Sequence, residues 1–353
     1  MALALIGASA AQAEPDVLER PAQPTALAKT SALMAVTRAG KRLVAVGERG
    51  IVLLSDDSGT SWRQANVPVS ESLTNVRFVD ERDGWAIGHS GLILHSADGG
   101  QTWQRQLDGR KAADLSLTLA RQFGERAKPG DIRAKSLLAD AERLVADGPD
   151  KPFLDLWFHD PNEGFVVGAY GLILGTSDGG RTWLSWQDRI DNPRGHHLYA
   201  ISVVGDDILV AGEQGALFHS TNRGKSFDEV KTPYAGTYFG VRHLVDGGAL
   251  VFGLRGNIYV AAIGLRDWQK VASGAESTLN GGAALDDGNL VLVDQSGRLL
   301  RSKDGGRSFQ VASTRLGFPL TGVASAPDGA VVVVGLGGVA RMAASAADTG
   351  AKK

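Results

Sequence analysis

The adjacent residues His196 and His197 are the side chains in this chain best suited to binding a metal or transferring a proton. Neighbouring side chains on a strand point to opposite faces, so this pair does not predict a shared metal ion. The chain has no Cys, which excludes thiolate metal sites, iron–sulfur clusters and a cysteine nucleophile. The string Gly335–Gly338 lacks the Lys-Ser/Thr of a phosphate loop. The residues therefore predict no catalytic centre, metal or cofactor.

Composition narrows the class of protein further. The chain has 353 residues, of which 43% are apolar, and its 37 basic and 39 acidic residues leave a net charge of −2. This apolar fraction is typical of a folded domain, and the balanced charge argues against bulk attraction to nucleic acid. Glycine is the exception, with 46 residues where a background of about 7% is usual. An excess of glycine without a matching excess of proline indicates many tight turns.

The glycines recur at a regular spacing. Two residues three apart, usually both glycine, close an apolar run seven times, and the first member of each pair stands at positions 47, 88, 168, 212, 253, 294 and 335. The steps are near 41 residues except for one of 80, which accommodates an insertion. Within the second unit, apolar residues alternate in four short segments separated by turns such as 80–84 and 98–100. Seven units of four short antiparallel strands predict an all-β, seven-bladed β-propeller over residues 14–342.

Closure of the ring needs a complete seventh blade. The seventh unit lacks its outer strand, while residues 16–20 precede the first complete unit. We therefore expect residues 16–20 to supply that strand, so that the two ends of the chain meet in one blade and no edge is left bare.

A second motif follows five of the seven glycine pairs. It has the form S-x-D-x-G-x-T-W, in which the acid accepts hydrogen bonds from turn amides and the aromatic residue packs between blades. We assign it a structural role, carried by Asp57, Trp62, Asp98, Trp103, Asp178, Trp183, Asn222, Phe227, Asp304 and Phe309. The motif is identified as the Asp-box, or BNR repeat, which also occurs in sialidases. A sialidase-like glycoside hydrolase or glycan-binding propeller is therefore the alternative interpretation. Against it, the Phe-Arg-Ile-Pro motif of that family is absent, and no tyrosine–glutamate nucleophile pair is recognisable.

The whole unit more closely resembles another Asp-box family. Residues 80–103 and 160–183 match D-x-x-x-G-W-A-x-G-x-x-G-x-I-L-x-x-x-D-G-G-x-T-W best, and the resemblance covers about residues 30–342. It is the repeat of the photosystem II assembly/stability factors of plants and cyanobacteria. The resemblance implies a seven-bladed, non-enzymatic propeller that holds a newly made membrane-protein subunit on the lumenal side.

Residues 108–150 interrupt the repeat. Apolar residues at helical spacing on both sides of Pro129 predict a helical hairpin, with Asp131 as N-cap and Gly148 as the C-terminal stop. The hairpin either packs on the propeller for stability or serves as a lid or docking element. It should emerge on the face that carries the glycine-pair turns, opposite the Asp-boxes. On that face we expect a partner-binding ring made of Glu48, Arg49, His89, Tyr170, Glu213, Arg255 and Gln295.

The ends of the chain suggest where the protein works. Residues 1–13 are typical of a signal-peptide remnant ending in Ala11-Gln12-Ala13, and the composition of the tail 343–353 predicts disorder. No later stretch has the ~20 apolar residues of a membrane span. We therefore expect an exported protein, periplasmic or in the thylakoid lumen of a photosynthetic source. We expect it to be a monomer that binds a protein partner and acts as an assembly or accessory factor for a membrane-associated complex, without nucleic acid.

Overall fold

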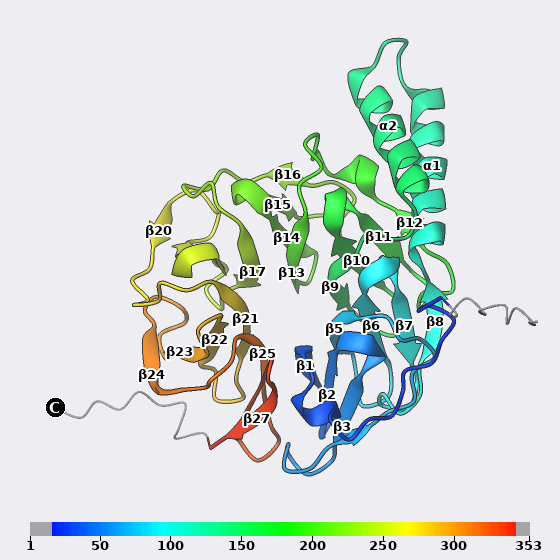
Figure 1. Ribbon diagram of the computed structural model, residues 1–353. Helices are drawn as coiled ribbons and strands as arrows, with labels where there is room; N and C mark the ends of the chain where they lie inside the picture. The colour runs from blue at the N-terminus through cyan, green and yellow to red at the C-terminus, as the bar shows by residue number, and fades with distance from the viewer. Residues whose placement is uncertain (1–15, 344–353) are drawn as a thin grey trace, which may run out of the picture.

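The strands form a ring of seven antiparallel sheets around a central channel (Figure 1). The computed structural model describes residues 16–343, so the proposed signal-peptide segment and the tail beyond residue 343 lie outside the described residues. Six sheets have four strands, ordered from the channel outwards as they follow one another in the chain. This is the seven-bladed propeller that the repeat predicts.

The first three blades flank the insertion, and each has four strands. The first blade contains β1 (Leu33–Ala39), β2 (Arg42–Gly47), β3 (Val52–Ser55) and β4 (Arg63–Gln64). The second contains β5 (Leu73–Phe78), β6 (Gly84–Gly88), β7 (Ile93–Ser96) and β8 (Gln104–Leu107). The third contains β9 (Phe153–Phe158), β10 (Gly164–Gly168), β11 (Ile173–Thr176) and β12 (Leu184–Ser185).

The remaining four blades complete the ring. The fourth contains β13 (Leu198–Val204), β14 (Asp207–Gly212), β15 (Leu217–Ser220) and β16 (Asp228–Glu229). The fifth contains β17 (Tyr238–His243), β18 (Ala249–Gly253), β19 (Ile258–Ala261) and β20 (Trp268–Lys270). The sixth contains β21 (Leu279–Ala284), β22 (Leu290–Asp294), β23 (Arg298–Ser302) and β24 (Gln310–Arg315). The seventh contains β25 (Leu320–Ser325), β26 (Val331–Gly335) and β27 (Gly338–Met342).

The expectation that residues 16–20 complete the seventh blade is wrong. Among the described residues that blade has three strands, and residues 16–20 form a turn at the outer edge of the first two blades. Leu18 is 2% exposed in the apolar cluster between those blades, and the carbonyl of Val17 accepts a hydrogen bond from the backbone N–H of Ser70. The physical reason is that Leu18 finds an apolar pocket there. Pro21, which has no backbone N–H to donate, also disfavours a strand in this segment.

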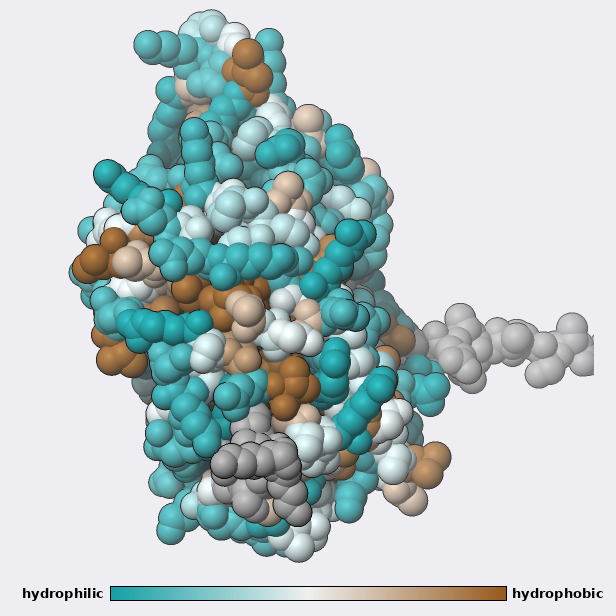
Figure 2. Space-filling model, turned by 90° about the vertical axis from the view of Figure 1, so that its left-hand side faces the viewer, coloured by the Kyte–Doolittle hydropathy of each residue, from teal (hydrophilic) through white to brown (hydrophobic). Residues whose placement is uncertain are grey.

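The core consists of apolar wedges between neighbouring blades. Seven clusters of buried side chains each join two adjacent sheets, because the β-branched and aliphatic residues of the second and third strands are covered on both faces. The wedge between the seventh and first blades contains Leu33 and Val36 of β1 with Val332 and Val334 of β26. Side-chain packing therefore closes the ring at this joint, with no strand pair between the two blades within residues 16–343. Around the outside, the side that carries β20 and β24 is largely hydrophilic, with apolar residues gathered in a band near mid-height (Figure 2).

The insertion forms the predicted helical hairpin, α1 (Gly109–Arg126) and α2 (Ile132–Asp147). Asp131 caps α2 by accepting hydrogen bonds from the backbone N–H groups of Arg133 and Ala134, and Gly148 ends it with a φ of 84°. Asp108 caps α1 in the same way, which the sequence pattern does not single out. Apolar side chains of both helices, Ala112, Ala113 and Leu144, join the wedge between the second and third blades. The helices then run outwards past β12 and project beyond the rim of the ring (Figure 1).

Candidate interaction face

Five turns of one kind lie on the same face of the ring. They are the short helices η2 (Glu48–Gly50), η3 (His89–Gly91), η4 (Ala169–Gly171), η6 (Glu213–Gly215) and η7 (Leu254–Gly256), each between the second and third strands of a blade. In each, the two central residues have positive φ and the fourth residue donates its N–H to the carbonyl of the first, which defines a type I′ turn. Because neighbouring strands are antiparallel, the Asp-box turns lie at the opposite end of the blades. We call these two surfaces the turn face and the Asp-box face.

The two central positions of these turns have different roles. A Cβ on the second, always glycine, would lie 2.2 Å from the carbonyl oxygen of Val69 at Gly50 and 2.1 Å from that of Ala275 at Gly256. The backbone therefore requires glycine there. The first central position favours Asn, Asp or Gly, because other L-residues are strained at positive φ. Here it holds none of these: the five residues, with φ between 53° and 57°, are Arg49, Ser90, Tyr170, Gln214 and Arg255.

The structure places the predicted ring residues on the turn face but not in one site. Five are exposed at separate points around the ring: Arg49, His89, Tyr170, Arg255 and Gln295. The two glutamates are half-buried and bond to the backbone. Glu48 Oε1 accepts the N–H of Ala32, and Glu213 Oε2 accepts the N–H of His197, so both fasten the turn to the start of an inner strand.

The sixth of these turns is built differently. The buried carboxylate of Asp294 accepts hydrogen bonds from the backbone N–H groups of Ser296 and Arg298, and also from the side chain of Arg298. Gln295 therefore lies in a turn that the side chain of Asp294 stabilises by hydrogen bonds. Unlike the first central residue of the other five turns, it is not at positive φ.

One cleft joins the hairpin to the turn face. It has a volume of about 380 Å³ and lies between α2 and the turns of the third and fourth blades. Its lining includes Tyr170 and Glu213, which the sequence pattern selects, together with side chains of α2 and of the loop that precedes β13. The lining residues are Ser136, Asp140, Arg143, Leu144, Asp147, Lys151, Tyr170, Pro193, Arg194, Gly195, His196, His197, Glu213 and Gln214.

Charges in the cleft are largely paired, but one buried group is not. The ammonium of Lys151 lies 3.1 Å from Asp147 and 2.5 Å from Asp150, and 5.0 Å above the ring of Tyr170. Burial lowers the pKa of Lys151, but these two carboxylates outweigh it and raise the pKa. His196 is 6% exposed, and its Nε2 atom has no hydrogen-bond partner among residues 16–343. Burial lowers the pKa of His196, which favours the neutral form of its imidazole.

A row of rings leads from the cleft towards the channel. The ring of Tyr170 lies 4.9 Å from that of His197, which lies 6.1 Å from that of Tyr199, which in turn meets Phe239 edge-on at 4.9 Å. Tyr199 is on β13 and Phe239 on β17, the innermost strands of the fourth and fifth blades. Sequence reasoning misses Tyr199 and Phe239. The available signal is an aromatic residue directly after the buried first residue of two successive inner strands.

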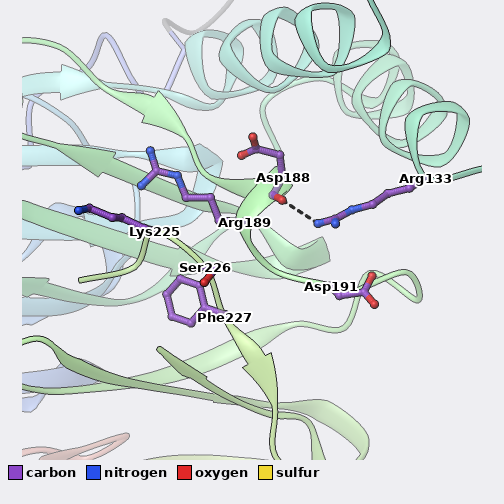
Figure 3. Close-up of a pocket in the computed structure, with 7 residues that line it drawn as sticks. All are labelled: Arg133, Asp188, Arg189, Asp191, Lys225, Ser226 and Phe227. Carbon is purple, nitrogen blue, oxygen red and sulfur yellow. Dashed lines mark hydrogen bonds between the residues drawn. The ribbon is translucent and has the colours of Figure 1, made fainter. Parts of the chain in front are cut away.

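A second cavity, of about 470 Å³, lies at the rim where α2 meets the third and fourth blades (Figure 3). Its two arginines are already bound to backbone carbonyls. Arg133 donates to the carbonyl oxygen of Asp188 at 2.7 Å, and Arg189 donates to that of Gly224 at 3.2 Å while lying on the ring of Trp186. Asp188 and Arg189 belong to η5 (Gln187–Arg189). This cavity is therefore a joint that holds the hairpin to the propeller.

The Asp-box face is occupied by self-contained loops. Asp98 accepts hydrogen bonds from the hydroxyl of Ser96 and from both the N–H and the hydroxyl of Thr102, and the other complete boxes repeat this geometry. Bonds of this kind lower the pKa of Asp57 and of Asp178 to about 2. Within residues 16–343, no tyrosine hydroxyl is hydrogen-bonded to a glutamate, and no group of three His, Asp or Glu side chains could hold a metal. The carboxylates of this face thus stabilise their own loops.

Fold and turns together define a class, the seven-bladed propellers built from Asp-box repeats. A family model described as photosynthesis system II assembly factor YCF48 matches residues 54–124 and 142–300, which is more than half of the chain. The chain belongs to this family.

No helix within residues 16–343 has the length and apolar character needed to cross a membrane.

Two curated relatives resemble part of the chain. The photosystem II assembly lipoprotein Ycf48 of Synechococcus sp. (strain CC9902) is 35% identical over 74 residues, which is 21% of this chain and 22% of that protein. The chloroplastic photosystem II stability/assembly factor HCF136 of rice (Oryza sativa subsp. japonica) is 30% identical over 98 residues, 26% of this chain and 24% of that protein. The matched part spans less than a quarter of the length of either relative.

Solved structures extend the likeness of fold over nearly the whole chain. A structure of YCF48 bound to D1 peptide has a TM-score of 0.65 at 13% identity and covers 89% of this chain and 94% of its own. YCF48 from Cyanidioschyzon merolae has a TM-score of 0.64 at 17% identity, covering 90% and 97%. A streptogramin B lyase has a TM-score of 0.65 at 14% identity, covering 89% and 93%. An enzyme therefore shares the fold, and only the site can separate binding from catalysis.

Proposed function

We propose that this protein is a non-catalytic binding propeller that holds an extended segment of a membrane-protein subunit on its turn face during assembly of a membrane-associated complex. One observation carries the proposal. At five equivalent turns, a position that favours Asn, Asp or Gly holds Arg, Ser, Tyr, Gln and Arg, all on one face. Strain retained at equivalent sites indicates that the side chains, rather than the turn, are needed.

The shape of the face favours an extended polypeptide as the ligand. The cleft beside α2 offers the exposed ring of Tyr170, and the row of rings continues past Tyr199 to Phe239. A linear track that begins in a cleft and ends at the channel fits a segment of several residues better than a single small molecule. Amphipathic rings beside polar groups are typical of protein interfaces.

The proposed setting is the periplasm, or the thylakoid lumen in a photosynthetic source. It is supported by membership of the family and by the chloroplastic relative. The solved YCF48 structure with bound D1 peptide supports a peptide as the ligand, because a member of the same family binds one.

Site-specific photocrosslinking in cells tests the proposal. A photoreactive amino acid is placed at Gln214 and at Tyr199 on the turn face, and as a control at Ser58 in an Asp-box turn. We expect both turn-face positions to capture the same segment of one membrane protein, and Ser58 not to. Equal capture from Ser58, or different proteins from the two turn-face positions, would contradict a binding track on this face.

A binding measurement then tests the row of rings. A fluorescent peptide with the captured sequence is titrated with the full chain, and we expect Tyr199→Ala to weaken binding about tenfold, since one well-packed aromatic contact contributes about 1–2 kcal/mol or more. Val204→Ala is the matched control, because Val204 is 61% exposed at the opposite end of the same strand β13. Equal affinities for the two variants would remove Tyr199 from the track.

A further inference from the structure

Three charged residues lie together on the innermost strands, away from the turns. They are Arg77 on β5, Asp155 on β9 and Arg242 on β17, from the second, third and fifth blades. Asn75, two residues before Arg77 on β5, donates a hydrogen bond to Asp155, and the charges of Arg77 and Asp155 both act on Arg242, so the three groups lie near one another at the channel. The charged groups that shift the pKa of Arg242 are Arg77 and Asp155. The cluster therefore has two positive charges and one negative charge.

The carboxylate of Asp155 already has three hydrogen-bond donors. Its oxygens accept hydrogen bonds from the side-chain amide of Asn75 at 2.8 Å, the backbone N–H of Leu156 at 2.8 Å and that of Ile201 at 2.7 Å. Burial raises the pKa of Asp155, although Arg77 and these backbone N–H groups oppose the shift. Asp155 thus ties the third blade to its two neighbours, and its hydrogen bonds go to these amide groups rather than to either arginine.

The two guanidinium groups have few partners. Each has five N–H donors, yet within the described chain Arg242 makes one long hydrogen bond of 3.4 Å, to the carbonyl of Gly282, and Arg77 lies 4.6 Å above the ring of Trp157. By contrast, Arg42, Arg105 and Arg298 each have a carboxylate oxygen within 2.6–3.0 Å. The Nε1 atom of Trp157 is also buried without an acceptor among residues 16–343.

This arrangement has an electrostatic cost. Burial, and then the like charge of Arg77, lowers the pKa of Arg242 to about 10. Two like charges held in a partly desolvated channel repel one another, and an anion bound by their unused donors would offset this repulsion. Planar guanidinium forks match the oxygens of carboxylates and phosphates.

We propose that Arg77 and Arg242 form an oxyanion-binding site in the central channel, which takes a carboxylate or phosphate group between the two guanidinium groups. The site is separate from the track on the turn face and uses none of its residues. Occupancy would add the missing negative charge and lock the second and fifth blades to a common ligand.

Isothermal titration calorimetry of the full chain with inorganic phosphate, and separately with acetate, at constant ionic strength tests this site. We expect saturable one-site binding of at least one anion, weakened at least tenfold in Arg77→Met and in Arg242→Met. Arg266→Met is the matched control, because Arg266 is an exposed arginine between β19 and β20 of the same blade as Arg242, and it should bind as the unaltered chain does. Binding of both anions indicates a general oxyanion site, and binding of phosphate alone indicates a site selective for the dianion.

Thermal melting distinguishes a ligand site from a purely structural pair. Without an added oxyanion, Arg242→Met should melt at a higher temperature than the unaltered chain, because repulsion from Arg77 is removed, and phosphate should reverse this order. If Arg242→Met does not fold, Arg242→Lys keeps the charge, loses the fork and should show weakened phosphate binding at an unchanged melt. No saturable heat with either anion, or equal affinity in the arginine variants and the unaltered chain, would overturn the proposal.

Discussion

One carboxylate oxygen of Glu213, Oε2, contacts His197 twice. It accepts a hydrogen bond from the backbone N–H of His197 at 2.9 Å, and it lies 2.9 Å from the ring atom Nδ1 of His197. The pair fastens the η6 turn to the start of β13 and forms one wall of the cleft beside α2. In the first glycine-pair turn, Glu48 accepts the equivalent backbone hydrogen bond, from the N–H of Ala32, but no histidine ring takes part. The fourth blade therefore adds a titratable partner to a fastening that the fold uses elsewhere without one.

This fastening predicts an acid-dependent stability. Burial raises the pKa of Glu213, but the bonds and charge of His197 outweigh it, so the pKa falls below its usual value of 4.5. The ionised carboxylate thus stabilises the fold above about pH 4.5, and the contribution is lost as the pH falls through the lower folded-state pKa. We expect Glu213→Gln to reduce the free energy of unfolding at pH 7, and the difference to shrink as the pH falls below the usual glutamate pKa of 4.5. Urea unfolding at a series of pH values measures it, and a pH-independent difference would contradict the assignment.

The N-terminal segment should contribute strongly to stability. We expect Leu18→Ala to lower the free energy of unfolding by about 2–5 kcal/mol, because the side chain is 2% exposed between the first two blades. Leu27→Ala is the control, since Leu27 is 69% exposed and should change stability by less than about 0.5 kcal/mol. Denaturant unfolding checks both, and equal effects would mean that residues 16–20 do not pack as described.

Two equivalent tryptophans allow one hydrogen bond to be measured. Trp103 and Trp183 hold the same position in successive Asp-boxes and are both 4% exposed. Nε1 of Trp103 donates to the carbonyl of Gly100 at 2.9 Å, whereas Nε1 of Trp183 is buried without a partner in the described part of the chain. We expect Trp103→Phe to cost about 0.5–1.5 kcal/mol more than Trp183→Phe, the usual net contribution of such a bond. A larger cost at position 183 would show that its indole N–H has a partner in solution.

Substituting glycine for a residue at positive φ in these turns should preserve or raise stability but weaken partner binding. Arg255 has a φ of 57°, which costs an L-residue roughly 1–2 kcal/mol, while glycine adds about 0.5–1 kcal/mol of chain entropy to the unfolded state. We therefore expect Arg255→Gly to leave stability unchanged or raise it by up to about 1 kcal/mol, while weakening capture of the partner. Arg255→Ala keeps the strain and serves as the control. A clear loss of stability in Arg255→Gly would show that the side chain supports the fold.

Much of the architecture is predictable because it depends on local chemistry. The glycine at the second turn position is required by the backbone, and Asp131 begins a helix by accepting N–H groups within three residues, so both leave signals at fixed spacing. The cleft is not predictable in this way. It depends on where α2 comes to lie relative to the loop before β13, and no spacing in the sequence relates Arg143 to His196.

Two differences between expectation and structure have the same origin. Counting strands assigns residues 16–20 to the seventh blade, whereas the burial of Leu18 between the first two blades decides where they lie. The position of Tyr170 and Glu213 within the repeating unit assigns them to the turn face. The same reasoning cannot show that Tyr199 and Phe239 continue the row of rings. The sequence repeat reveals the residues that all blades have in common, whereas the candidate site is formed by residues that differ from blade to blade.

The three-stranded seventh blade has a consequence for how the ring comes apart. No strand pair joins β1 to β25 and β26, which meet through side-chain packing and a hydrogen bond from the hydroxyl of Thr321 to the carbonyl of Leu33. The described part of the molecule is therefore topologically a linear array of repeats bent into a circle, with a seam between its first and last units. In such an array, the end unit with the fewest backbone bonds to its neighbours opens first. Amide hydrogens of β27 and β26 should therefore exchange with solvent before those of the second to sixth blades, and unfolding should begin at the seam.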